Sequence, residues 1–134
     1  MNIVIETPKY SFFKYHKLGS HFHIEFFSPV PAIFNYGFVE DSLAEDGMER
    51  DVVVIGPRIT QGTVIKRDQF DGILRFVDDS VADDKHIIYL GGFFFKPVYL
   101  LYFHIYVVFK FSYYLLIKKK FAVCKVVGIE IFDK

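Results

Sequence analysis

The chain alternates short apolar runs with glycine and proline breaks, the pattern of a small β protein. The runs that we expect to form strands are residues 3–5, 12–17, 22–27, 51–55, 63–66, 72–77, 86–90 and 122–127. Leu18-Gly19-Ser20 is a suitable hairpin turn between two of them. Short strands with such punctuation and few helical periods are typical of closed all-β domains. We therefore predict a mainly β (α+β) fold built on a small closed β-barrel.

Residues 93–121 depart from this pattern and allow more than one interpretation. They predict either a helix packed on the barrel, apolar all round because it is also an oligomer face, or one or two strands. The run 98–117 is also long enough to span a bilayer, and Lys118-Lys119-Lys120 follows it. Polar interruptions such as Lys110, and the prevalence of Tyr, Phe and Val, favour buried strands or an oligomer contact over a membrane span.

Length and charge narrow the class of protein. With 134 residues, we expect a single domain spanning 1–134. The 16 basic residues balance 16 acidic ones, so net charge gives no argument for nucleic-acid binding. Cys124 is the only cysteine, which excludes an intrachain disulfide and a thiolate-rich zinc site. The first ten residues lack the pattern of a signal peptide, and we expect a cytoplasmic protein.

Acidic residues concentrate in two segments, 40–51 and 78–84, and suggest a metal site. Asp46 and Asp51 stand five apart where a loop enters a strand, and Asp78 and Asp83 have the same spacing at a strand end. If the fold brings the segments together, their carboxylates would bind Mg²⁺ or Mn²⁺, because hard cations prefer oxygen ligands. Acidic loops are more often solvated turns, and spacing alone does not exclude that alternative.

Several motifs in order resemble the soluble family I inorganic pyrophosphatases. The counterparts of the family's motifs are Ile3-Val4-Ile5-Glu6-Thr7-Pro8, Lys14-Tyr15, Asn35-Tyr36-Gly37-Phe38, Asp46-Gly47-Met48-Glu49-Arg50-Asp51, Gly62-Thr63-Val64 and Asp78 with Asp83-Asp84-Lys85. The similarity covers residues 3–17 and 35–90, and the chain diverges and is shorter at its C-terminal end. The resemblance implies a five-stranded, OB-like form of the β-barrel and Mg²⁺-dependent hydrolysis of pyrophosphate to two phosphates.

The resemblance also implies metal ligands. Carried over by position, Asp46, Asp51 and Asp83 would bind the metal pair that activates water and so form the catalytic group. Glu6 and Asp78 would hold further Mg²⁺ ions around the substrate.

Substrate contacts follow from the same positions. Lys14 and Lys85 would contact phosphate oxygens, and Tyr36 would donate a hydrogen bond to phosphate. Tyr114 (or Tyr113), with a lysine among 118–120, is the best counterpart of the family's Tyr-Lys pair. Without the resemblance, the residues have ordinary structural interpretations. Glu6 is then a charge at a strand edge, and Lys14 and Lys85 are solvent-exposed residues at strand ends. Tyr36 is a core aromatic residue whose hydroxyl reaches solvent.

Three departures from the family pattern bear on activity. Met48 stands where the family has the carboxylate that acts as general base or orients water, and a thioether cannot accept that proton. Residues 22–27 offer no arginine where the family clamps phosphate. His16 replaces a family glutamate and is interpreted as an exposed or structural residue more readily than as a phosphate contact.

Three functional hypotheses remain. The first is a divergent Mg²⁺-dependent inorganic pyrophosphatase with weakened activity. The second is a catalytically impaired descendant that binds cations or phosphate, or serves a structural role, in an oligomer formed through residues 93–117. Membrane attachment through 98–117 is a third. Because so much aromatic surface would otherwise be exposed, we expect a homo-oligomer.

Overall fold

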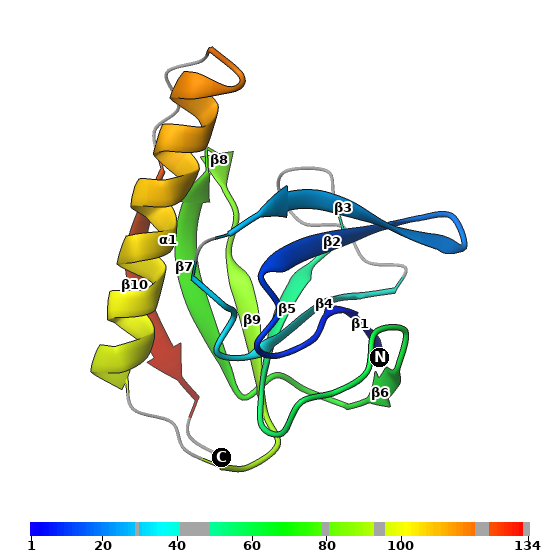
Figure 1. Ribbon diagram of the computed structural model, residues 1–134. Coiled ribbons are helices and arrows are strands. Elements are labelled where there is room, and N and C mark those ends of the chain that lie inside the picture. Colours follow the sequence, from blue (N-terminus) through cyan, green and yellow to red (C-terminus); the bar gives the residue numbers. More distant parts are fainter. Residues whose placement is uncertain (29, 41–48, 79–80, 93–95, 120–123, 133–134) are drawn as a thin grey trace.

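The computed structural model describes the chain apart from residues 29, 41–48, 79–80, 93–95, 120–123 and 133–134 (Figure 1). Its elements are β1 (Asn2–Thr7), β2 (Phe13–Leu18), β3 (His21–Phe27), β4 (Asn35–Val39), β5 (Asp51–Ile55), β6 (Val64–Lys66), β7 (Gly72–Asp78), β8 (Val81–Ala82), β9 (Lys85–Tyr89), α1 (Lys96–Leu116) and β10 (Lys125–Ile131).

One large sheet carries most of these strands. Its order is β10-β7-β9-β5-β4-β1-β6, with β8 paired to β7, while β2 and β3 form a separate hairpin. β5 pairs with β9 in parallel, and its other neighbour, β4, is antiparallel. The fold is mainly β with one helix, as predicted. The sheet has eight strands instead of the predicted five, and the pairings of the described strands form an open path from β10 to β6. Closure into a barrel stays a prediction.

β5 lies at the centre because both of its faces are buried. Val53 and Ile55 join the apolar cluster beneath α1, whereas Val52 and Val54 join a second cluster with β1. Successive side chains of a strand point to opposite faces, so a continuous β-branched run suits a strand covered on both sides. This run places Asp51, the first residue of β5, at the edge of the core.

Gly37 permits the close contact between β4 and β1. A Cβ atom at this position would lie 2.1 Å from the carbonyl oxygen of Val4, far inside van der Waals contact. Only glycine fits without moving β1, which carries Glu6. The sequence did not predict Asn35–Val39 as a strand, although all five residues are buried.

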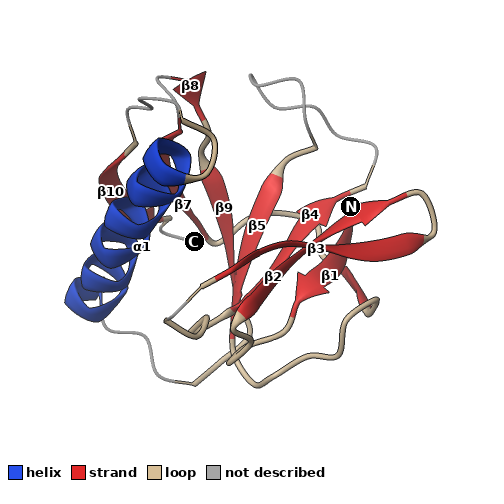
Figure 2. Cartoon of the chain, turned by 45° about the horizontal axis from the view of Figure 1, so that its top comes forward, coloured by secondary structure: helices blue, strands red, loops and turns tan. Residues whose placement is uncertain are grey.

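Helix α1 covers one end of the large sheet. It lies along β10 and β7, and the β2–β3 hairpin lies on the other side of the view (Figures 1 and 2). Its side chains Tyr99 and Phe103 are buried in the apolar cluster between helix and sheet, and the Phe103 ring stacks on Phe34 with 5.3 Å between centroids. Of the two interpretations of residues 93–121, the helix is therefore confirmed for the described part. By length and composition alone, α1 could also cross a membrane, a property that core helices of soluble proteins share.

The other strand predictions agree with the structure except near the C-terminus. The hairpin turn is confirmed, with Gly19 in the left-handed region at φ 63°. The strand predicted over 122–127 begins at Lys125 and continues to Ile131, because it pairs with β7 along its whole length. Its predicted start, at 122–123, lies outside the described residues.

Candidate active site

The candidate site centres on a lysine held between two carboxylates. Lys85 begins β9, is only 2% exposed, and pairs in register with Asp51 of β5. Its Nζ donates to Asp51 Oδ2 at 2.9 Å and to Asp83 Oδ2 at 2.7 Å. The parallel β5–β9 pairing thus brings together acids from the two segments singled out in the sequence. The alternative that Lys85 is a solvated strand end is wrong.

The two carboxyl groups differ in how readily they bind a proton. Burial would raise the pKa of Asp51, but the ammonium groups of Lys85 and Lys14 lower it overall. Burial raises the pKa of Asp83 overall, although Lys85 opposes this; the charge of Asp51 adds a smaller contribution in the raising direction. Asp51, which lies near two ammonium groups, therefore stays ionised more readily than Asp83.

Tyr36, from β4, presents a buried hydroxyl to the same region. Its Oη has no hydrogen-bond partner of ordinary geometry among the described residues. Lys14 Nζ and Lys85 Nζ lie 5.0 and 5.6 Å from its ring centroid. Burial, followed by the charges of Asp51 and Asp83, raises the pKa of the phenol well above its usual value. Tyr36 is therefore a neutral donor flanked by two ammonium groups. The interpretation in which its hydroxyl reaches solvent is wrong, because that hydroxyl is buried.

Glu6 is a buried carboxyl at the end of β1. It is 4% exposed, accepts a hydrogen bond from the Lys17 backbone N–H at 2.7 Å, and lies 3.5 Å from His16 Nδ1. Burial raises its pKa to about 7 despite the Lys17 hydrogen bond, and the charge of Asp51 contributes. The interpretation of Glu6 as a strand-edge charge is wrong. His16 contacts a predicted metal ligand, which no sequence argument had indicated.

Lys14 reaches the site from the hairpin. Its Nζ lies 3.8 Å from Glu25 Oε2, and its side chain is 18% exposed. Burial opposes the charged form of Lys14, but Tyr106 and the carboxylates of Glu25 and Asp51 raise its pKa overall. Glu25 occupies the segment where the family's arginine was sought, and it contributes a negative charge there instead.

Asp78 lies against the helix and not against Lys85. It accepts a hydrogen bond from Lys110 Nζ, and Cys124 Sγ lies 3.5 Å from its other oxygen. Burial would raise the pKa of Asp78, and Lys110 lowers it overall. Lys110 Nζ also lies 5.9 Å from the Tyr114 ring centroid, and burial raises the pKa of Tyr114 to about 12.

Lys110 is the residue that sequence reasoning missed. The sequence paired Tyr114 with a lysine among 118–120, but the lysine beside Tyr114 in the structure is Lys110. Lys118 and Lys119 are exposed past the helix end, and residue 120 lies outside the described part of the chain. A sequence signal existed, because Tyr106, Lys110 and Tyr114 recur every four residues and thus share one helical face. Lys110 lies 5.7 Å from the Tyr106 ring centroid, as this spacing requires.

Some predicted positions lie outside the described residues. Asp46, a predicted catalytic residue and metal ligand, and Met48, at the expected base position, both belong to segment 41–48. Within the described part of the chain, no three His, Cys, Asp or Glu side chains gather closely enough to hold a metal ion. The ligand set predicted from the two acidic segments stays a prediction.

Comparison with known proteins identifies the family. A family model described as "Inorganic pyrophosphatase" matches residues 3–90, about two thirds of the chain. The chain belongs to the inorganic pyrophosphatase family. A relative named inorganic pyrophosphatase from Haemophilus influenzae is 35% identical over 91 residues, covering 63% of this chain and 51% of its own. A protein of the same name from Corynebacterium efficiens is 32% identical over 89 residues, which cover 63% of this chain and 56% of that protein. The chain thus spans about half the length of these curated relatives.

Solved structures of the family extend the likeness beyond residue 90. An inorganic pyrophosphatase from Coxiella burnetii superposes with a TM-score of 0.72 at 25% identity, over 98% of this chain and 85% of that one. The enzyme from Thermus thermophilus gives a TM-score of 0.73 at 23% identity, over 98% and 82%. The second likeness supports the fold alone. The fold likeness thus extends past residue 90, where the match of the family model ends.

Proposed function

We propose that this protein catalyses Mg²⁺-dependent hydrolysis of inorganic pyrophosphate to two phosphates, as a cytoplasmic single-domain protein with the family's barrel. The observation that carries the proposal is the convergence of Lys14, Tyr36 and Lys85 beside Asp51 and Asp83. Cationic and neutral donors lie next to a carboxylate pair, as binding of pyrophosphate together with a divalent cation requires.

The carboxylate pair suits magnesium. Asp51 and Asp83 already share one cationic group, Lys85 Nζ, and the pKa of Asp83 is raised partly because the two acids repel each other. A divalent cation would relieve that repulsion, and all-oxygen ligands favour Mg²⁺, or Mn²⁺, over zinc. Asp51, Asp83 and Asp46 would hold the metal pair, with Glu6 and Asp78 on further ions. When bound, Mg²⁺ neutralises phosphoryl charge and lowers the pKa of a coordinated water.

The chain's own side chains would position pyrophosphate and its leaving group. Water attacks one phosphorus, the bridging P–O bond breaks, and the second phosphate leaves with the electron pair, while a proton of the water passes to solvent or to that phosphate. Lys14 and Lys85 would balance charge on the phosphate oxygens, and the Tyr36 hydroxyl would donate to one of them. Tyr114, beside Lys110 and Asp78, would donate to the leaving phosphate. Each of these roles needs a donor that stays protonated at neutral pH, which the raised phenol pKa values support.

The decisive experiment is phosphate release from pyrophosphate by the purified protein, first with Mg²⁺ and then with EDTA. We expect metal-dependent turnover above background. If calorimetry detects Mg²⁺ binding but no phosphate is released, the protein is instead a catalytically impaired family member that binds cations or phosphate. Met48 and the lack of an arginine in 22–27 favour this second hypothesis. Loss of both properties would leave only the family's fold.

Met48→Asp tests directly whether the missing carboxylate at position 48 weakens the activity. Restoring a carboxylate at this position should raise Mg²⁺-dependent kcat by about 10²-fold, because a positioned general base contributes about 10²–10⁴-fold. Glu49→Asp, next to it in the sequence, serves as the control and should not raise the rate. If Met48→Asp gives no gain, the assignment of position 48 is wrong.

A further inference from the structure

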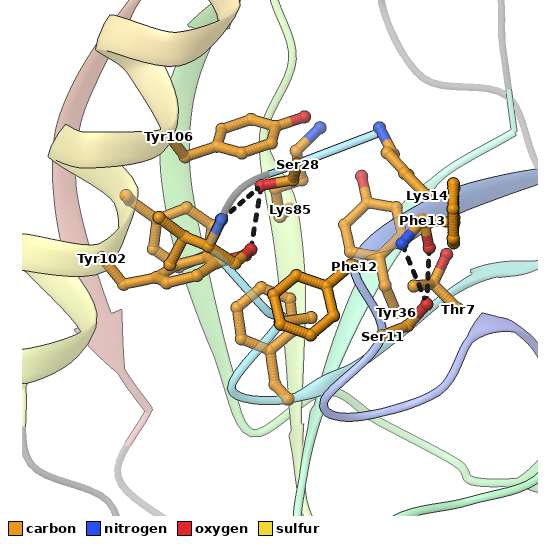
Figure 3. Close-up of a pocket in the computed structure, with 14 residues that line it drawn as sticks. Thr7, Ser11, Phe12, Phe13, Lys14, Ser28, Tyr36, Lys85, Tyr102 and Tyr106 are labelled. Carbon is orange, nitrogen blue, oxygen red and sulfur yellow. Dashed lines mark hydrogen bonds between the residues drawn. The ribbon is translucent and has the colours of Figure 1, made fainter. Parts of the chain in front are cut away.

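An apolar pocket opens directly beside the proposed phosphate site (Figure 3). Its volume is about 40 Å³, and its walls come from the hairpin, from α1, and from β4 and β9 between them. Phe12, Phe13, Phe34, Tyr102 and Phe103 supply most of the lining. Pyrophosphate itself has no apolar part, so this wall has no role in the proposed hydrolysis.

The polar groups of the pocket lie at one end. Figure 3 shows the side-chain tips of Lys14, Lys85, Tyr36 and Tyr106 on the same side of the pocket, with Phe12 and Tyr102 away from them. The Tyr36 hydroxyl there is buried and makes no hydrogen bond of ordinary geometry with the described residues, apart from an approach to the Asp51 carboxylate. A buried donor without a partner costs free energy, which an incoming acceptor would recover.

The hydroxyl groups of the threonine and the two serines in the lining are already used by the fold. Thr7 Oγ1 accepts from the Tyr15 backbone N–H at 3.0 Å, and Ser11 Oγ donates to the Phe13 carbonyl at 2.7 Å. Ser28 Oγ donates to the Val30 carbonyl at 2.8 Å. Away from the lysine end, the described lining therefore offers aromatic and aliphatic surface, which favours an apolar group over a polar one.

The volume sets the size of that group. A cavity of about 40 Å³ for water-sized spheres holds roughly three waters, each needing about 10–15 Å³ on this measure and representing about 30 Å³ of liquid. The corresponding space, roughly 90 Å³, matches one aromatic ring or a short branched alkyl chain. The aromatic walls favour a ring, because offset and edge-to-face ring contacts add to the burial of apolar area.

We infer that the pocket binds the organic group of an aryl phosphate whose phosphate lies against Lys14, Lys85 and Tyr36. This inference rests on the proposed function, since it uses the same phosphate-binding end of the site. It extends the ligand class from inorganic pyrophosphate to phosphate monoesters with a single ring. The ring replaces empty apolar space, and the phosphate satisfies the buried hydroxyl.

The test compares two ligands that differ only in the organic group. Phenyl phosphate and methyl phosphate are titrated into the protein by calorimetry in Mg²⁺ buffer, with inorganic phosphate as the reference. We expect phenyl phosphate to bind at least about tenfold more tightly than methyl phosphate, because burying a ring removes much apolar area from water. Transferred NOEs from the phenyl protons to aromatic protons of the protein would locate the ring.

Variants of the lining decide whether the pocket is responsible. Ala32→Leu fills it from a position that is 8% exposed, and should abolish the preference for phenyl phosphate while leaving methyl phosphate binding unchanged. Phe12 lines the pocket and is 46% exposed, so Phe12→Ala should reduce the preference for phenyl phosphate with less effect on folding. The control is Phe132→Ala, at a residue 40% exposed just after β10, which should leave the preference intact.

Each outcome is decisive. Equal affinity for the two esters overturns the inference but leaves the phosphate site and the pyrophosphatase assay unaffected. A preference that survives both Ala32→Leu and Phe12→Ala also overturns it, because the ring would then bind elsewhere. Absence of binding by all three ligands, including inorganic phosphate, overturns the inference together with the proposed phosphate site.

Discussion

Two motif residues that adjoin in the sequence have different roles. Asn35 is fully buried, and its Oδ1 accepts from the backbone N–H groups of Lys9 and Ile59 at 3.0 and 2.8 Å. Its Nδ2 donates to the Pro57 carbonyl at 2.8 Å. Asn35 thus ties two loops to β4, whereas Tyr36, the next residue, has a buried hydroxyl with no such bond. Only Tyr36 has donor capacity left for a ligand.

Tyr36→Phe should therefore separate stability from activity. Removing a buried hydroxyl that makes no hydrogen bond of ordinary geometry, but approaches the Asp51 carboxylate, should change the free energy of unfolding by less than about 1 kcal/mol. Loss of a hydrogen bond to a charged phosphate should lower kcat/KM about 10-fold or more. Denaturant unfolding and the phosphate-release assay measure the two effects. Tyr89→Phe is the matched control, since the Tyr89 hydroxyl donates to the Gly92 carbonyl at 2.6 Å. The control should lose a little stability and no activity; a loss of more than about 1 kcal/mol in Tyr36→Phe would contradict the assignment.

His86 predicts a pH dependence of stability. Its ring stacks on Phe70 with 4.1 Å between centroids, and its Nδ1 is buried without a partner among the described residues. Burial and then the charge of Arg50 lower the pKa of His86 below 6.5, although Asp84 and Asp51 oppose this. The unfolded chain therefore binds a proton at a higher pH than the folded chain, so stability falls as the pH drops below about 7.

His86→Phe should reduce this loss of stability. Between pH 7.5 and 5.5, the melting temperature of the variant should fall less than that of the parent protein, because the ring contact remains and the titrating group is gone. Thermal unfolding followed by circular dichroism measures both slopes. His104→Phe, on the exposed surface of α1, controls for introducing phenylalanine. Identical slopes for His86→Phe and the parent would contradict the role of His86.

At the scale of elements, the Lys110–Asp78 pair anchors α1 to β7. Lys110 is 6% exposed although it lies in a helix whose other described side chains are uncharged after Lys96. The pair joins the middle of the helix to the end of the strand that precedes the second acidic segment. Lys110 is buried and Asp78 half-buried, so breaking this pair is costly, because the buried ammonium group is left without its partner.

Lys110→Met should lower the free energy of unfolding by about 3 kcal/mol. This is the usual cost of removing one partner of a buried ion pair, and here it leaves the Asp78 carboxylate without its lysine. The double variant Lys110→Met with Asp78→Asn should recover most of the loss. Arg75→Met removes the exposed contacts of Arg75 with Asp84 and Glu130 and should cost less than about 1 kcal/mol. Urea unfolding of all three variants tests this, and equal losses in Lys110→Met and Arg75→Met would refute an anchoring role.

At the scale of the whole molecule, the outer face of α1 is exposed and apolar. Leu101, Ile105 and Val108 are 61%, 43% and 66% exposed, and their spacing of four and three places them on one stripe. A stripe of this kind on a small protein favours association with another surface. Because we expect a homo-oligomer, we place its contact here.

Leu101→Glu combined with Val108→Glu should shift the protein toward monomer without loss of folded stability, since neither side chain contributes to the core. Analytical ultracentrifugation measures the shift, and thermal unfolding checks the fold. The control is Leu18→Glu, 57% exposed in the hairpin turn. If association is unchanged in the double variant, the oligomer uses another surface.

The sequence by itself determined most of the strands and the family. Short apolar runs such as Val52–Ile55, bounded by glycine and proline, set β5 and most of its neighbours, because strand formation and turn chemistry are local properties. The separate motifs that contain Tyr36 and Lys85 indicated which residues belong to the candidate site. The order of the motifs along the chain sufficed for the family, since the match to residues 3–90 rests on sequence.

Only the tertiary structure decided how these residues are used. Whether Glu6 and Lys85 are buried depends on which strands pair, and the parallel β5–β9 pairing joins segments more than thirty residues apart. The choice between helix and strand over 96–116 also depended on packing, because a uniformly apolar run fits either until its neighbours are known. The contact of Lys110 with Asp78, and the apolar pocket beside the lysines, arise from side chains that meet only after α1 packs onto the sheet.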